Sequence, residues 1–313
     1  EYLGRKLSGI MSSSFLKAHL ALGAVALIYG ANYIIAKDVM DKGHLMPLAF
    51  IFLRVSTATV LFWFFHGVYV KERIKSRADW IRLAVCGLFG VALNQMFFFS
   101  GLKLTWPINA SLIMTTTPVL VLIASAILLG ERITPAKLLG ITMGGAGAIL
   151  LIAFGRTLHF GVDSILGDLF VFCNASCYGI YLVLVKPLMK RYSAVTVVKW
   201  TFTFGLFAVA PFGIPQLGAS DFSAFPLSVL LSVGYVLIFT TFFAYLFNAY
   251  ALRVVNPSVV SIYIYLQPLL AATFSLLLGL EQLTPNKWLA AILIFAGVFL
   301  VSRQQLNPKP SAD

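Results

Sequence analysis

Arg54 is the residue of this sequence whose chemistry asks most for an explanation, because its charge lies deep within an apolar segment. The segment runs from 46 to 67 and Arg54 lies eight residues into it, which is about 12 Å along a helix. A guanidinium at that depth needs an anion or a water-filled path. It either meets a substrate carboxylate or caps helix-end carbonyls and pairs with a nearby residue, and the sequence leaves both roles open. Lys199 is a second intramembrane charge, whose long side chain can also reach the aqueous phase.

Uncharged polar and aromatic side chains inside the apolar segments form a second candidate set. Each is costly in hydrocarbon unless it faces a cavity or a partner, and any one of them can serve as a hydrogen bond between helices. As a set they indicate an uncharged, aromatic-lined, amide-rich cavity, which suits zwitterionic or polar organic solutes better than inorganic ions. The predicted substrate-cavity residues are Tyr29, Asn32, Asn94, Gln95, Thr115, Tyr178, Tyr181, Tyr245, Asn248, Tyr263 and Gln267.

Other chemistry finds no support in the sequence. No Asp or Glu lies in the interior of an apolar segment, and the four histidines lie near segment ends, so the usual carboxylate proton relay is missing and facilitated exchange down a gradient is favoured. No nucleophile and base, metal-ligand cluster or phosphate-binding glycine loop is found. We therefore expect no catalytic residue, metal, cofactor or ATP drive. Cys86, Cys173 and Cys177 lie within apolar segments as expected free thiols.

The elements that position these residues are membrane-spanning helices. The 313 residues are 60% hydrophobic and only 11% charged, with a mean hydropathy of +0.92, which is far from a soluble domain. Apolar runs of about 20 residues, the length that crosses a bilayer, follow one another with connections too short to fold separately. The fold class is an all-α membrane protein with ten transmembrane helices, predicted at 17 to 38, 46 to 67, 79 to 103, 107 to 130, 135 to 154, 165 to 187, 193 to 214, 227 to 252, 257 to 280 and 285 to 303.

The net charge of +12 follows from topology rather than from a nucleic-acid partner. With a cytoplasmic N-terminus, sixteen Lys and Arg side chains fall on the cytoplasmic side and five on the other, as the positive-inside rule requires. An even number of spans then places both termini in the cytoplasm. Residues 1 to 16 and 304 to 313 are predicted to be terminal tails. Residues 1 to 10 precede Met11 and are interpreted as an added or extended start.

The chain contains an internal repeat. Residues 102 to 151 match those 150 positions later without a gap, with identities that include Pro118 and Pro268; farther upstream the offset becomes 149 and pairs Tyr29 with Tyr178. The halves are 17 to 154 and 165 to 303. Because five spans is an odd number, the second half enters the bilayer from the opposite side, and such inverted repeats are typical of alternating-access carriers.

The two matched prolines interrupt spans four and nine. Each lacks an N–H and kinks its helix, so Pro118 and Pro268 are predicted hinges, although packing alone also explains a proline in a membrane helix. Thr134 and Pro135 are predicted to cap and begin a helix after a tight turn. The small residues at 144 to 148 are expected to allow close helix packing.

Several segments, taken in order, resemble the EamA-type members of the drug/metabolite transporter superfamily. They are "YGANYIIAK" from Tyr29, Arg54 in span two, "NQMFFFSGLKLT" from Asn94, "NASLIMTTTPVLVLIASAILLGERIT" from Asn109, "YGIYLVLVK" from Tyr178 and "PSVVSIYIYLQPLLAATFSLLLGLEQLT" from Pro257. The resemblance covers about 17 to 303. It implies two inverted five-helix repeats, a central cavity between them and export of metabolites, in some members amino acids. This family usually has Trp at the positions of Tyr29 and Tyr178.

Three functional classes follow. The first is a secondary transporter of the bacterial inner membrane that exports small polar organic metabolites, most directly amino acids or related zwitterions. The second is a channel-like or facilitative path, including lipid or drug efflux, without counter-transport. The third is a membrane-embedded transferase. The expected partners are a small-molecule substrate and the lipid bilayer; a monomer is sufficient, and a dimer is left open.

Overall fold

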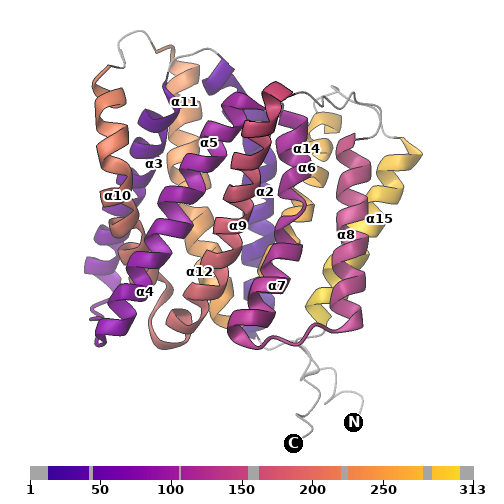
Figure 1. The fold of residues 1–313 in the computed structure, drawn as a ribbon, viewed down its shortest axis with the longest axis horizontal. Helices are drawn as coiled ribbons and strands as arrows, with labels where there is room; N and C mark the ends of the chain where they lie inside the picture. Colours follow the sequence, from indigo (N-terminus) through magenta and orange to yellow (C-terminus); the bar gives the residue numbers. More distant parts are fainter. Residues whose placement is uncertain are drawn as a thin grey trace, which may run out of the picture.

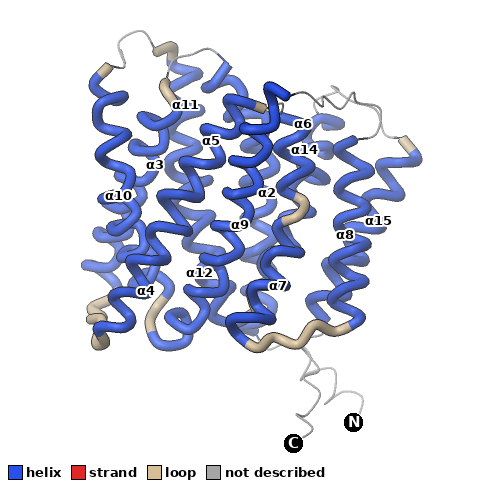
Figure 2. Tube along the Cα trace, in the orientation of Figure 1, coloured by secondary structure: helices blue, strands red, loops and turns tan. Residues whose placement is uncertain are grey.

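The computed structural model describes residues 13–41, 45–105, 107–153, 162–219, 225–277 and 284–303, and these ranges contain helices and turns but no strand (Figure 2). Within them, ten helices are long and apolar enough to cross a membrane. They stand side by side in one bundle (Figure 1). The predicted all-α fold with ten spans is therefore confirmed.

The first half of the chain supplies five spans, two of which are irregular. The first, second and fifth are α2 (Ser13–Asp41), α3 (Pro47–Tyr69) and α8 (Pro135–Ala153). The third is built from α4 (Arg77–Gly87), the π-helical segment η1 (Leu88–Leu93) and α5 (Asn94–Leu104), and the fourth from α6 (Pro107–Met114) and α7 (Thr117–Leu129).

The second half repeats this plan. Its continuous spans are α9 (Val162–Arg191), α10 (Ala194–Gly218) and α15 (Pro285–Arg303). The eighth span is built from α11 (Leu227–Tyr235), the π-helical η3 (Val236–Phe243) and α12 (Ala244–Val254), and the ninth from α13 (Pro257–Ile262), the 3-10 turn η4 (Tyr263–Tyr265) and α14 (Leu266–Leu277). Spans three and eight thus share a π-helical middle, and spans four and nine share an interruption.

The interruptions of spans four and nine lie just before the two matched prolines. Turn residues Thr115 and Thr116 separate α6 from α7, and η4 separates α13 from α14. Since proline has no N–H, the carbonyl four residues earlier loses its helical donor, which accounts for an irregular turn ahead of Pro118 and Pro268. Movement at these breaks stays a prediction.

The two broken spans meet at their breaks. The Tyr265 hydroxyl donates a hydrogen bond to the Thr115 carbonyl at 3.0 Å, and the two residues are 150 positions apart, so each is the other's counterpart in the repeat. A contact between symmetry mates lies at the pseudo-two-fold axis. The bond also satisfies a carbonyl at the break of span four, which hydrocarbon could not do.

Helices of the two halves pack closely in counterpart pairs, α3 along α10 and α8 along α15 (Figure 1). Within the second pair, a Cβ added to Gly297 would lie 2.5 Å from the Gly140 carbonyl oxygen and 2.7 Å from the Gly144 nitrogen. Both atoms belong to the backbone, so the approach requires glycine. The close packing expected from the small residues of span five is confirmed.

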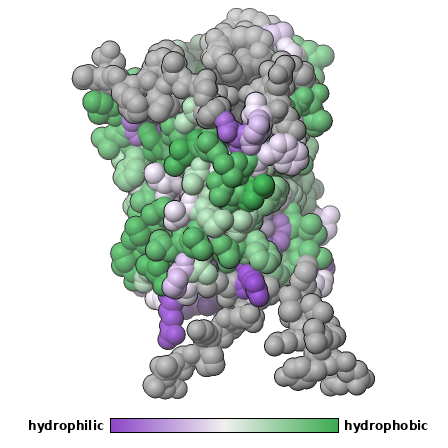
Figure 3. Space-filling model, turned by 90° about the vertical axis from the view of Figure 1, so that its right-hand side faces the viewer, coloured by the Kyte–Doolittle hydropathy of each residue, from purple (hydrophilic) through white to green (hydrophobic). Residues whose placement is uncertain are grey.

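The outer surface and the short turns agree with a membrane-spanning bundle. In Figure 3 hydrophobic side chains cover most of the middle of the visible face, and large side chains such as Phe207 and Ile127 are 71% and 75% exposed. At the turn before α8, the Thr134 hydroxyl accepts from the Lys137 N–H at 3.3 Å. The predicted capping threonine and first-turn proline are therefore confirmed there.

Replacing Gly297 by alanine is expected to push α8 and α15 apart. Overpacking of this kind costs about 1–3 kcal/mol, so the thermal unfolding midpoint of the purified protein in detergent should fall. Gly23→Ala is the matched control, because nothing lies within 4 Å of the added Cβ and alanine favours a helix over glycine by about 0.5–1 kcal/mol. An unchanged midpoint for Gly297→Ala would contradict the close approach.

Candidate functional site

A small pocket lies between spans of both halves. It is bounded by α2, α9, α12 and the interrupted ninth span, and its cavity volume of about 20 Å³ holds roughly one or two waters. The lining residues are Leu22, Val25, Ala26, Tyr29, Tyr178, Asn248, Val260, Tyr263, Ile264 and Gln267. Five of the eleven predicted cavity residues, Tyr29, Tyr178, Asn248, Tyr263 and Gln267, are among them.

Arg54 is buried on α3, only 8% exposed. Its Nε donates to the Thr241 hydroxyl of η3 at 3.0 Å. Its guanidinium carbon stands 5.2 Å from the ring centre of Phe99 and 5.8 Å from that of Phe50, which are cation–π distances. Within the described part of the chain no carboxylate pairs with Arg54, and its two terminal nitrogens make no hydrogen bond.

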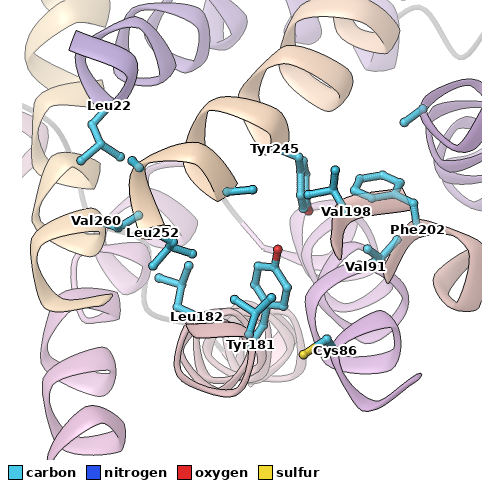
Figure 4. Packing of buried hydrophobic residues seen from close by; sticks show 14 of the residues in the cluster. Leu22, Cys86, Val91, Tyr181, Leu182, Val198, Phe202, Tyr245, Leu252 and Val260 are labelled. Atoms are coloured by element: carbon cyan, nitrogen blue, oxygen red, sulfur yellow. The ribbon is translucent and has the colours of Figure 1, made fainter. Parts of the chain in front are cut away.

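Four tyrosines connect Arg54 to the pocket. Tyr29 and Tyr245 are the ionisable neighbours of Arg54, while Tyr178 and Tyr181 pack with ring centres 6.3 Å apart. Figure 4 shows Tyr181 and Tyr245 pointing into the same space between α9 and α12. Since Tyr29 also lines the pocket, this tyrosine adjoins both the pocket and Arg54.

The π-helical segments shape this site. Gly90 of η1 accepts from the Tyr245 hydroxyl at 3.1 Å, and a Cβ there would lie 2.3 Å from the Tyr181 ring, so only glycine lets the ring pack. On η3, the Thr241 hydroxyl donates to the Val236 carbonyl at 2.9 Å. π-Helical turns are frequent at functional sites. Here η1 of the first half contacts Tyr181 and Tyr245, and η3 of the second half contacts Arg54.

Gln95 is a buried amide beside the Tyr245 hydroxyl that makes no hydrogen bond of good geometry in the described structure. It is 3% exposed and neighbours Tyr245, but neither its Nε2 nor its Oε1 has a hydrogen-bond partner. Leaving a buried polar group unpaired costs about 1–3 kcal/mol. An amide in that state is suited to receive a polar ligand or water.

Two other predicted cavity residues have structural partners. Asn94 donates to the Asn174 carbonyl at 3.4 Å, and Asn174 donates back to the Asn94 carbonyl at 2.7 Å, which ties α5 to α9. The Thr115 hydroxyl donates to the Leu112 carbonyl at 2.6 Å, within its own interrupted span. Neither residue lines the pocket. Asn32 belongs to α2, but its side chain lies outside the described residues.

Lys199 lies apart from the pocket. Its Nζ is 4.2 Å from the Trp63 ring centre and 4.6 Å from that of Trp200, and 3.2 Å from His66 Nδ1. An aromatic and imidazole environment near the start of α10 accounts for this charge without a substrate. The structure thus does not bring the two predicted intramembrane charges together.

Three residues of the site were missed by the sequence reasoning. Tyr265 joins the two breaks, Thr241 holds Arg54, and His19 Nδ1 lies 2.6 Å from the hydroxyl of the pocket residue Tyr263. The repeat held a signal for one of them, because Tyr265 is the counterpart of Thr115. Thr241 and His19 depend on contacts between distant helices, which no local pattern reveals.

Comparisons with known proteins agree with this architecture. The model of the EamA-like transporter family matches twice, at residues 16–153 and 165–303. An "Uncharacterized transporter" of Archaeoglobus fulgidus is 28% identical over 92% of this chain and 98% of its own length. A "Probable terminal-alkyne amino-acid exporter" of Streptantibioticus cattleyicolor is 24% identical over 83% of this chain and 85% of its own.

A solved crystal structure shares the fold, with a TM-score of 0.74 at 22% identity, over 90% of this chain and 95% of that one. The family match, in contrast, follows the sequence through both halves and leaves out little beyond the tails and the connection between halves. It confirms the resemblance drawn from the ordered motifs. The chain is a multi-pass membrane protein that belongs to the EamA-like transporter family.

Proposed function

We propose that this protein is a secondary transporter that exports small organic solutes bearing a carboxylate, most directly amino acids, by alternating access. The observation that carries the proposal is Arg54, a buried cation without a described counter-anion next to a polar, aromatic pocket. A charge in the membrane interior is costly unless it is paired or hydrated. A substrate carboxylate is the partner that would complete it.

The geometry of arginine favours a carboxylate over other acceptors. With Nε committed to Thr241, the two terminal nitrogens keep their donors for a ligand, and a guanidinium binds carboxylates through paired charge-assisted hydrogen bonds. The unpartnered amide of Gln95 adds a neutral donor and acceptor nearby. Phenol and amide groups around the pocket would then hold the rest of a zwitterion.

The symmetry supports movement around this site. Both halves carry an interruption at the same place, and Tyr265 and Thr115 connect the two at the pseudo-two-fold axis. Inverted repeats with broken helices at the middle of the bilayer are how many carriers exchange inward-facing and outward-facing states. The small size of the pocket supports a carrier over a channel-like path.

The distribution of basic residues suggests how the protein is oriented in its membrane. With a cytoplasmic N-terminus, sixteen Lys and Arg side chains fall on that side and five on the other, so we assign both termini to the cytoplasm. We place the protein in a bacterial inner membrane, with export as the net direction. One relative with a printed role in amino-acid export supports this direction and substrate class.

Counterflow in proteoliposomes tests the proposed function. Vesicles preloaded with single unlabelled amino acids are expected to take up trace amounts of the labelled compound in a saturable manner, and internal solute should stimulate that uptake. Protein-free vesicles are the control. Uptake that is linear in concentration and indifferent to internal solute would instead establish the channel-like alternative.

Arg54→Gln is expected to lower kcat/KM for amino acids by about 10- to 150-fold, since a charge-assisted hydrogen bond contributes about 1.5–3 kcal/mol. Transport of the matching amino-acid amides, which lack the carboxylate, should change much less. Lys199→Gln is the matched control, because it removes a buried cation away from the pocket. If kcat/KM falls equally for amino acids and for their amides in folded Arg54→Gln protein, Arg54 has a structural role only.

Pro118→Ala and Pro268→Ala test the hinges. Alanine restores the missing N–H and lets the helix continue, so the maximal rate of counterflow should fall while the half-saturating concentration changes little. Pro211→Ala is the control, since Pro211 lies inside α10 without interrupting it. Rates equal to wild type would leave Pro118 and Pro268 as packing residues.

A further inference from the structure

His19 is joined to the pocket by one short contact. Its Nδ1 lies 2.6 Å from the Tyr263 hydroxyl, Tyr263 lines the pocket, and it begins η4 at the interruption of span nine. His19 itself stands about one turn before pocket residue Leu22 on α2. The contact therefore ties the first span of one repeat to the broken span of the other.

The second ring nitrogen of His19 has no hydrogen-bond partner among the described residues. Nε2 is buried without a hydrogen bond, and the Phe15 ring packs against the imidazole with centres 4.2 Å apart. A neutral imidazole has one N–H and one lone pair, whereas the protonated ring has two N–H donors. Here the Tyr263 oxygen can accept one of them and nothing described accepts the other, so the closed arrangement disfavours the protonated ring.

No ionisable group of the neighbouring elements compensates for a charge on His19. The elements packed against α2 are α11, η3, α12, η4 and α14. Their ionisable side chains are Tyr235, Tyr245, Tyr250, Arg253, Tyr263 and Tyr265, and α2 adds Lys17 and Tyr29 within the part whose side chains are described. Of these, only Tyr263 has a hydrogen bond with the ring, and no described carboxylate pairs with it.

We infer that His19 is a proton-binding site of this protein: it takes up a proton from the water that enters when the pocket opens at this end, and returns it to that water when the contact with Tyr263 closes. Opening admits water, which accepts the second N–H and hydrates the charge. A proton that binds the open state better than the closed state shifts the population toward the open state. Opening at this end would then respond to pH without an intramembrane carboxylate.

The repeat places a second ionisable group at the equivalent position. Asp168 follows His19 by the 149-residue offset, and on α9 its carboxylate accepts a hydrogen bond from the Thr105 hydroxyl at the end of α5. The two groups stand at opposite ends of the bundle because the repeats are inverted. Only histidine normally changes charge near neutral pH, so the proton response belongs to the His19 end.

Thiol labelling in nanodiscs tests this inference without any transported solute. Val25 lines the pocket and is 5% exposed, so Val25→Cys, in full-length protein whose three native cysteines are replaced by alanine, reports opening to a water-soluble maleimide. Glutathione labelled in the same buffers corrects for the pH dependence of thiol reactivity. We expect the corrected rate to rise between pH 7.5 and 5.5, by up to about tenfold per pH unit, the limit for one linked proton.

His19→Gln keeps a polar side chain but cannot be protonated, and it should flatten the corrected profile. His66→Gln is the matched control: His66 contacts the Glu72 carbonyl and Lys199, away from the pocket, and its loss should leave the pH response intact. A flat profile with His19 present overturns the inference, and so does a response that survives in folded His19→Gln protein. Neither result depends on whether amino acids are the substrate, which the counterflow experiment decides separately.

Discussion

The structure depends on one constraint: hydrocarbon offers no hydrogen-bond partner, so every irregular piece of backbone must be satisfied inside the protein. A regular helix satisfies its own backbone hydrogen bonds. Irregular turns must borrow a partner from another helix, so they lie where helices face one another. The Thr115 carbonyl at the break of span four is reached by Tyr265, and the Gly90 carbonyl in η1 by Tyr245. The same phenols that complete the backbone also fill the centre of the bundle. The irregular segments and the candidate site coincide for this physical reason.

The other buried cations have their binding partners within the protein, whereas Arg54 has few. Lys137 forms an ion pair with Glu131 at 2.6 Å. Lys186 donates to the Leu252 and Val255 carbonyls at 2.5 and 2.6 Å, at the end of α12 where the helix dipole favours a cation. Lys199 has two indoles and an imidazole. Arg54 has one hydroxyl and two rings, and most of its donor capacity is unused. That contrast, more than burial alone, marks its surroundings as incomplete without a ligand.

Much of the fold could be read from the sequence because hydrocarbon imposes a length on each span and the repeat imposes a register. Ten spans and the matching positions of the two prolines follow from those two rules, whereas the breaks and the close packing of span five follow from the chemistry of proline and of small residues. The site was harder to predict than the fold, because the sequence does not distinguish an amide that lines a pocket from one that bonds to another helix. Asn248 lines the pocket while Asn94 is held by a reciprocal bond across α5 and α9, a distinction set by rotation of packed helices. The spacing of polar residues along a span does not show which of them faces a cavity and which faces another helix.

Inverted repeats balance the two states of a carrier only as far as the halves are alike. Tyr29 and Tyr178 are identical mates and both line the pocket, so in the proposed mechanism they offer the same surface to a solute from either side. His19 and Asp168 are unlike mates with unlike partners, and the bond from Tyr265 to Thr115 has a donor in one half only. Identical pairs set the shared geometry, whereas unlike pairs make the two states unequal in energy and in response to protons. A few substituted positions can therefore make one state more populated than the other within an otherwise symmetric frame.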